Sequence, residues 1–287
     1  MYWILGITLI ISGCRKLEIV YPSIETSITN DTCSGGLFVL NEGNMGSNKA
    51  QIDYMDFTSG IYTRNIYGSS NPDALKELGD VGNDIQMYGG KLYAVINCSH
   101  KVEVMDCNCH RRGQIDIPNC RCLAFSNGKM YVSAYVGSIM DAEHLGAVYE
   151  VDTTTLLITR EVEVGHQPEH MTIADGKLYV TNSGGYRVGV YDSTVSVVDI
   201  ASMTEIKKIP VRKNPSHIII DSKGRLWINC RGDYNGEKGS LIVVANDEII
   251  KRFELQINNM SYCGHQLYLL SAKEKSIRVI DTESMEI

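Results

Sequence analysis

The sequence VGHQPEHMTIADGKLYVTNSGGYRVGVYDSTVSVVDIASMTEIKKIPV, residues 164–211, contains four short runs in which apolar and polar residues alternate. The runs are HMTIA, KLYVT, TVSVVDI and EIKKIPV, and turn-forming residues separate them. This pattern predicts four antiparallel strands joined by turns. Such a sheet carries apolar side chains on both faces, so we expect further copies of it along the chain.

The second run carries a tag that recurs: usually a basic or polar residue, then Leu or Met, an aromatic residue and an aliphatic residue. Six copies are present, namely GLFV at 36–39, KLYA at 91–94, KMYV at 129–132, KLYV at 177–180, RLWI at 225–228 and QLYL at 266–269. Their aromatic residues lie 38 to 55 residues apart, a spacing typical of propeller blades. We therefore predict an all-β protein, a β-propeller of four-stranded antiparallel blades from a seven-bladed family, with about six blades in this chain.

The third strand of the unit repeatedly ends in an apolar residue followed by Asp. A carboxylate at this place can accept N–H groups of the next turn, so we expect a structural role. The residues concerned are Asp56, Asp106, Asp152, Asp199 and Asp281.

The N-terminal segment has the features of a lipoprotein signal. Residues 1–13, MYWILGITLIISG, are apolar but too few to cross a bilayer as a mature helix. The following ISGC, residues 11–14, resembles the lipobox of bacterial lipoproteins and makes Cys14 the lipidated residue, although no Lys or Arg precedes the apolar run. A cysteine that follows an apolar stretch by chance is the alternative. We expect residues 14–35 to form the lipidated N-terminus and a tether, and residues 36–287 to form the propeller.

Both ends of the predicted propeller lack strands. No innermost strand is recognisable before the tag at 36–39, and residues 282–287 only begin the fourth strand of the last blade. We expect a seven-bladed propeller that is incomplete at its C-terminal end. A six-bladed ring with imperfect closure is the alternative.

The charge of the chain bears on its partners. The 287 residues carry a formal net charge of −7 and no cluster of basic residues, so we expect no nucleic-acid partner. Sixteen tyrosines against four phenylalanines suit surfaces where rings contact a ligand and hydroxyls stay hydrated. Propeller strands also favour Tyr for structural reasons.

The predicted topology places recognition on one face. If strands a to d run from axis to rim, the b–c and d–a connections share a face, and the b–c loops at 41–48, 182–191 and 230–235 are long. Loops on a rigid scaffold commonly carry recognition. The candidate ligand-binding residues on this face are Arg121, His166, Asn182, Tyr186, Tyr191, Arg231 and Tyr234.

Two histidines occupy equivalent corners of adjacent predicted blades, His170 in QPEH and His217 in NPSH. With a carboxylate and an amide nearby, two imidazoles could ligate a divalent metal and support a lyase or a lactone hydrolase. Hydrogen bonding to turns and to channel water is the reading we favour, because no third strong ligand lies beside them by position. We therefore predict no metal site.

Four cysteines resemble a zinc motif, with CNC at 107–109 and CRC at 120–122. The two pairs fall at opposite ends of a predicted strand about 20 Å long, so one tetrahedral zinc cannot reach both. Cys98 lies on the same predicted face as Cys120. A disulfide between them and two free thiols both remain open.

Several stretches together resemble a known family. KLYVTN at 177–182, followed by TVSVVD at 194–199, looks like the YVTN/YncE-type propellers. GLFVLNEG at 36–43, LGD at 78–80, SGG at 183–185 and YD at 191–192 are similar to surface lipoproteins of Bacteroidetes, and within them to the cobalamin-binding BtuG family. The resemblance covers residues 36–287. The early C-terminal end and a corner at residues 119–122 without Pro depart from the family pattern.

The resemblance implies a function. It suggests a lipid-anchored protein on the cell surface of the outer membrane that binds cobalamin or another corrinoid and passes it to a TonB-dependent outer-membrane transporter. It implies no enzymatic activity and no cofactor, with the corrinoid as a ligand that His170 or His217 would approach. Two alternatives are a protein-interaction propeller without a small ligand and a metal-dependent lyase or lactone hydrolase.

Overall fold

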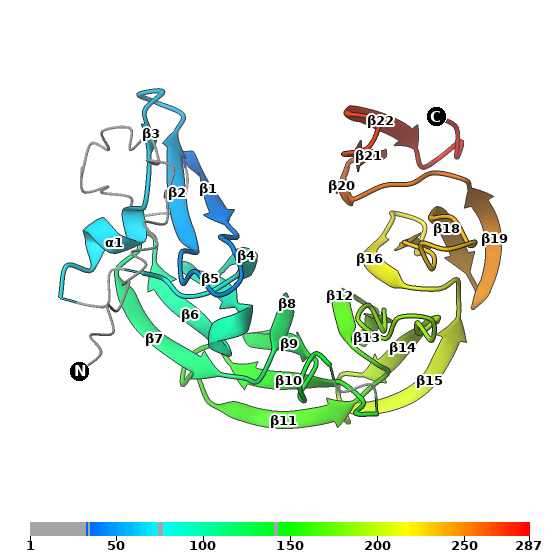
Figure 1. Ribbon diagram of the computed structural model, residues 1–287, viewed down its shortest axis with the longest axis horizontal. Coiled ribbons are helices and arrows are strands. Elements are labelled where there is room, and N and C mark those ends of the chain that lie inside the picture. The colour runs from blue at the N-terminus through cyan, green and yellow to red at the C-terminus, as the bar shows by residue number, and fades with distance from the viewer. Residues whose placement is uncertain (1–32, 34, 74–76, 141–142) are drawn as a thin grey trace, which may run out of the picture.

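The computed structural model describes residues 33, 35–73, 77–140 and 143–287. The predicted signal peptide, Cys14 and nearly all of the predicted tether lie outside these residues. The described chain forms six antiparallel sheets, of which the first and last have three strands and the other four have four. The sheets follow one another around an open arc in chain order (Figure 1). This arrangement confirms the predicted propeller of about six blades.

The blades are numbered along the chain. Blade 1 contains β1 (Gly36–Asn41), β2 (Gln51–Asp56) and β3 (Tyr62–Thr63). Blade 2 contains β4 (Gly82–Tyr88), β5 (Lys91–Ile96), β6 (Lys101–Asp106) and β7 (Arg111–Asp116). Blade 3 contains β8 (Cys120–Ser126), β9 (Lys129–Ala134), β10 (Ala147–Asp152) and β11 (Ile158–Glu163).

The second half of the arc continues the series. Blade 4 contains β12 (Pro168–Ala174), β13 (Lys177–Asn182), β14 (Thr194–Asp199) and β15 (Thr204–Pro210). Blade 5 contains β16 (Pro215–Ile220), β17 (Leu226–Cys230), β18 (Ser240–Ala245) and β19 (Glu248–Phe253). Blade 6 contains β20 (Asn259–Cys263), β21 (Gln266–Ser271) and β22 (Ser276–Asp281).

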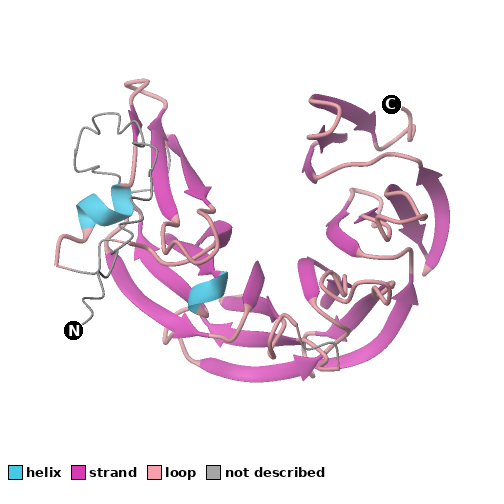
Figure 2. Cartoon of the chain, in the orientation of Figure 1, coloured by secondary structure: helices cyan, strands magenta, loops and turns pink. Residues whose placement is uncertain are grey.

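Helices are few and short among the described residues (Figure 2). They are α1 (Ile66–Ser70) and the 3₁₀ turn η1 (Asn97–Ser99). The sequence pattern predicts a strand over residues 61–67, and Asn71-Pro72 with Gly79 predicts a short helix over residues 71–79. The structure instead ends β3 at Thr63 and begins α1 after Asn65, whose side chain accepts a hydrogen bond from Gly68 N. Residues 71–73 and 77–79 are not helical.

Each blade interface is built from the two apolar residues of the tag. The aromatic residue faces the next blade, as Trp227 does against Met260 and Leu267 of blade 6. The Leu or Met before it faces the preceding blade, as Leu178 of blade 4 does in a cluster with Tyr131 of blade 3. Because the residues alternate along a strand, one tag covers both faces of its sheet.

The aspartates that end the third strands hold the following turns, as predicted. Asp152 Oδ1 accepts hydrogen bonds from Thr154 N (3.0 Å) and Thr155 N (2.9 Å). Asp106 and Asp199 accept equivalent bonds in blades 2 and 4. These carboxylates are therefore structural parts of the hairpins into the fourth strands.

One disulfide was not anticipated. Cys33 is bonded to Cys107 in the turn between β6 and β7, with a Cα–Cα distance of 4.7 Å. Cys98 and Cys120, whose pairing the sequence left open, are free thiols. The disulfide ties the chain before blade 1 to blade 2.

Candidate functional site

The connections that precede the innermost strands lie at the same end of the blades as the b–c loops. In blade 4, Ser183 N, just after β13, donates to Gln167 O, just before β12 (3.2 Å). Arg231 N donates to Asn214 O in the same way in blade 5 (2.9 Å). The predicted loop face is therefore formed by both sets of connections.

The corner before each of these innermost strands has a repeated backbone conformation. Its residue has a positive φ although it is not glycine, a conformation that costs energy and occurs often at functional sites. A β-bulge follows within β4, β8, β12 and β16. The corner residues are Val81 (φ 61°), Asn119 (47°), Gln167 (46°) and Asn214 (58°). Because a bulge re-aims side chains, it affects where His170 and His217 point.

The imidazoles of His170 and His217 stack on each other across adjacent blades. Their ring centroids are 3.4 Å apart with 30° between the planes. Burial lowers the pKa of His170 to about 4, helped by the positive charges of Arg121 and Arg231. Burial, together with His170 and Arg231, lowers the pKa of His217 to about 2. Both rings are therefore neutral near pH 7.

Arg121 forms an ion pair with Glu169 of the next blade. The guanidinium donates three hydrogen bonds of 3.0 to 3.1 Å to the carboxylate, and it lies 4.9 Å from the ring centre of Tyr135. The Tyr135 hydroxyl also bonds Glu169. Burial alone would lower the pKa of Arg121, but the charge of Glu169 raises it. Arg121 is thus engaged between blades 3 and 4.

Asn182 is fully buried at the end of β13. Its amide accepts from Gly165 N (3.0 Å) and donates to the hydroxyls of Thr194 (3.0 Å) and Ser196 (2.9 Å). The side chain therefore joins the end of β13 to the connection before β12 and to β14. It does not line the surface.

The other predicted residues of blade 4 lie closer to the solvent. His166 is held by Asp192, whose carboxylate accepts from His166 N (3.0 Å) and lies 3.4 Å from His166 Nδ1. Tyr186 is 47% exposed and meets Tyr135 edge to face. Tyr191 packs edge to face against Tyr234, with 6.2 Å between ring centres.

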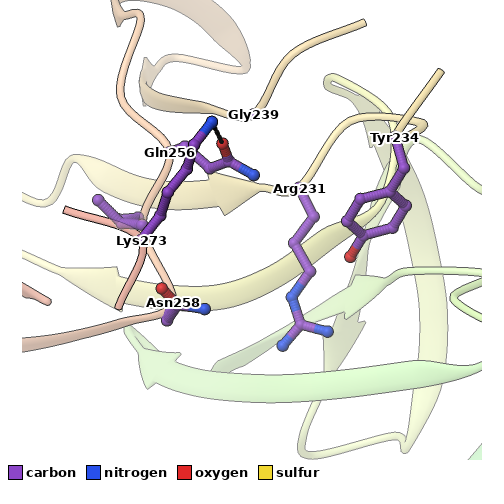
Figure 3. A pocket seen from close by; sticks show the side chains of 7 residues that line it. Arg231, Tyr234, Gly239, Gln256, Asn258 and Lys273 are labelled. Carbon is purple, nitrogen blue, oxygen red and sulfur yellow. Dashed lines mark hydrogen bonds between the residues drawn. The ribbon is translucent and has the colours of Figure 1, made fainter. Parts of the chain in front are cut away.

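A hollow of about 320 Å³ opens between blades 5 and 6 on the loop face. Arg231 and Tyr234 come from the b–c loop of blade 5, and Lys273 comes from that of blade 6. Figure 3 shows these side chains around the hollow with Gln256 and Asn258 of the connection between the blades. Of the predicted residues, Arg231 and Tyr234 line this hollow together, and Tyr191 contacts Tyr234.

Several residues of the face were missed from the sequence. Glu169 precedes His170 in QPEH, but its ion pair with Arg121 joins two blades and leaves no signal in the sequence. Gln256, Asn258 and Lys273 belong to a connection and a loop that carry no repeated motif. Only the adjacency of blades 5 and 6 brings them to Arg231.

Two kinds of feature are absent from the described residues, a cluster of metal ligands and a membrane-spanning helix. Within the described part of the chain, no group of three or more His, Cys, Asp or Glu side chains is arranged to hold a metal ion. Among the same residues, no helix has the length and apolar character needed to span a bilayer.

Several solved structures have a similar fold. Hydrazine synthase from Kuenenia stuttgartiensis shares 14% identity at a TM-score of 0.67, over 94% of this chain and 81% of that chain. A protein of unknown function from Bacteroides caccae shares 13% identity at a TM-score of 0.58, over 88% and 92%. The designed protein Ika8 shares 13% at 0.55, over 88% and 68%. At these identities the likeness shows the fold alone.

No family model matches the chain, and no curated protein matches it. The similar structures therefore show the propeller fold, and the comparisons name no function for this chain.

Proposed function

We propose that this protein captures a corrinoid at the cell surface, as a lipid-anchored propeller of the YncE-like and BtuG type, and passes it to a TonB-dependent outer-membrane transporter. The hollow between blades 5 and 6 carries this proposal. It presents guanidinium, amide, ammonium and phenol groups of Arg231, Asn258, Gln256, Lys273 and Tyr234 on the loop face.

A corrinoid is a broad disc edged by amides and methyl groups. Its amide carbonyls would accept hydrogen bonds from Gln256 and Asn258, which are exposed on the loop face. The rings of Tyr191 and Tyr234 offer apolar surface for the methyl groups while their hydroxyls stay hydrated. A few placed polar groups around an apolar contact are the usual composition of a small-molecule site.

Two further features are compatible with this role. The Cys33–Cys107 disulfide suits a protein that folds in an oxidising compartment. The lipobox-like ISGC at 11–14 suits a lipid anchor. Capture followed by transfer needs binding without turnover, so the proposal requires no catalytic group.

The test is isothermal titration of cobinamide into the full chain in detergent. We expect saturable binding and no chemical change of the ligand. Tyr234→Ala should weaken binding about tenfold, because it removes an aromatic contact from the lining of the hollow. Tyr268→Ala is the matched control, since Tyr268 is a partly exposed tyrosine on the side face of blade 6. No binding by the unmodified chain would reject the corrinoid assignment.

A further inference from the structure

The hollow between blades 5 and 6 is rich in cations although the whole chain carries a formal charge of −7. Arg231 and Lys273 line this hollow and also line an adjoining one over the blade 5 loop, where Lys238 is a third lining cation. Among the described residues, Glu237 is the one carboxylate that lines the adjoining hollow, and none lines the first. The local charge is therefore opposite in sign to that of the molecule.

The carboxylates around the hollow already have partners. Glu237 binds Arg212 at 2.6 Å, and Asp233 binds Lys213 at 3.0 Å. Asp233 also accepts backbone N–H groups of residues 235–237. In the blade 6 loop, Glu274 binds Arg278 at 2.7 Å. These pairs leave little negative charge to neutralise the cations of the hollow.

The cations themselves have few acceptors. In the described part of the chain the Arg231 guanidinium has no ion pair or side-chain hydrogen bond. Lys273 Nζ makes one long contact of 3.5 Å to Gln256 Oε1. Their donor groups are thus open to solvent and to a ligand. Figure 3 shows both side chains at the same hollow.

We infer that this hollow is an oxyanion subsite, in which Arg231 and Lys273 bind a phosphate ester carried by the ligand. Guanidinium and ammonium donors match phosphate oxygens, and charge-assisted hydrogen bonds are the stronger ones. Asn258 and Tyr234 add neutral groups at the edge. This inference rests on the proposed function for the identity of the ligand, and on the hollow alone for its chemistry.

Two corrinoids separate the subsite from corrin recognition. Cyanocobalamin carries a phosphodiester in its nucleotide loop, and cobinamide lacks that loop and its phosphate. We expect Arg231→Gln/Lys273→Gln to weaken cyanocobalamin binding at least about tenfold, because two charge-assisted contacts are lost. Cobinamide binding should change less than about twofold. Equal losses for the two ligands would overturn the inference.

The charge-matched control is Arg252→Gln/Lys223→Gln, which removes one Arg and one Lys that lie outside the hollow. It should keep cyanocobalamin affinity within about twofold, since exposed charges far from a ligand are screened by salt. A loss as large as that of the hollow variant would mean that net charge, and no subsite, governs binding.

A third arm uses inorganic pyrophosphate in place of a corrinoid. We expect weak saturable binding that Arg231→Gln/Lys273→Gln abolishes and the control retains. If neither corrinoid binds but pyrophosphate does, the proposed function fails and the oxyanion subsite stands. If cobinamide binds while pyrophosphate does not and the two corrinoids bind alike, the subsite fails and corrinoid capture stands.

Discussion

The stacked imidazoles of His170 and His217 link the stability of the fold to pH. Their pKa values are about 4 and about 2 in the folded chain, against about 6.5 for an unperturbed histidine. Below pH 6.5 the unfolded chain therefore binds protons that the folded chain does not. The free energy of unfolding should fall as the pH falls, by about 1.4 kcal/mol per pH unit for each histidine until its folded pKa is reached.

Replacing both histidines should remove this dependence. We expect urea titrations of His170→Gln/His217→Gln between pH 6.5 and pH 4 to show a weaker dependence of unfolding free energy on pH. The slope should be smaller than that of the unmodified chain by about 1.4 kcal/mol per pH unit for each of the two histidines. His265→Gln is the control, because its exposed imidazole lies outside the stack, 3.6 Å from Glu283. Parallel stability curves for the double variant and the unmodified chain would show that the stack does not exclude protons.

For the candidate site, the sequence predicted the positions of some residues but not their contacts. The motifs QPEH and NPSH predicted equivalent corners for His170 and His217. Their contact was not predicted, because it depends on how two blades are placed side by side. Arg121 and Asn182 were chosen for their chemistry, but an ion pair with Glu169 and a buried amide network occupy them. Such partners come from other blades or loops and leave no local pattern.

Side-chain exposure alternates along β21, a strand of the last blade. Leu269 of β21 is fully buried against blade 5 together with Trp227 and Met260, whereas Leu270 is 44% exposed on the opposite face. Leu269→Ala should cost about 2–5 kcal/mol of unfolding free energy, because it leaves a cavity. Leu270→Ala should cost less than about 1 kcal/mol. Urea titration of the two variants provides the comparison.

These neighbours form a matched pair, since both changes remove the same atoms from the same strand. Equal losses of stability would mean that the outer face of β21 is covered in solution. The exposed face carries Tyr268, Leu270 and Ile277 around a shallow apolar hollow of about 280 Å³.

Strands were predictable and their exceptions were not. The tag fixes strand b of every blade, because alternation and flanking turns both appear within a few residues. Blade 1 departs after β3, where Asn65 caps α1 and the helix residues Ile66 and Tyr67 are buried. The Tyr67 hydroxyl reaches Glu103 of blade 2 at 3.2 Å. That packing across blades overrides the strand-like pattern of residues 61–67.

At each of the five interfaces between blades, an aromatic tag residue packs against apolar residues of the next blade. The outer faces of blades 1 and 6 have no such partner in the described structure. Tyr268 of blade 6 is 38% exposed, while the equivalent Trp227 of blade 5 is fully buried. Leu37 of blade 1 is 53% exposed, while the equivalent Leu92 of blade 2 is buried. The terminal blades thus bury one face each, as in other repeat proteins whose units gain stability from their neighbours.

Local stability should therefore decrease toward the ends of the arc. We expect backbone amides of β21 to exchange with deuterium at least about tenfold faster than those of β13, because blade 4 is packed on both faces.

Blade 1 differs from blade 6, since the Cys33–Cys107 disulfide ties its chain to blade 2. A reductant should speed exchange in β1 and β2 and leave β21 unchanged, because the crosslink restrains only that end. Mass spectrometry of peptides from each blade, with and without reductant, measures both effects. Uniform protection of β13 and β21 would mean that the arc unfolds as one unit with its ends covered.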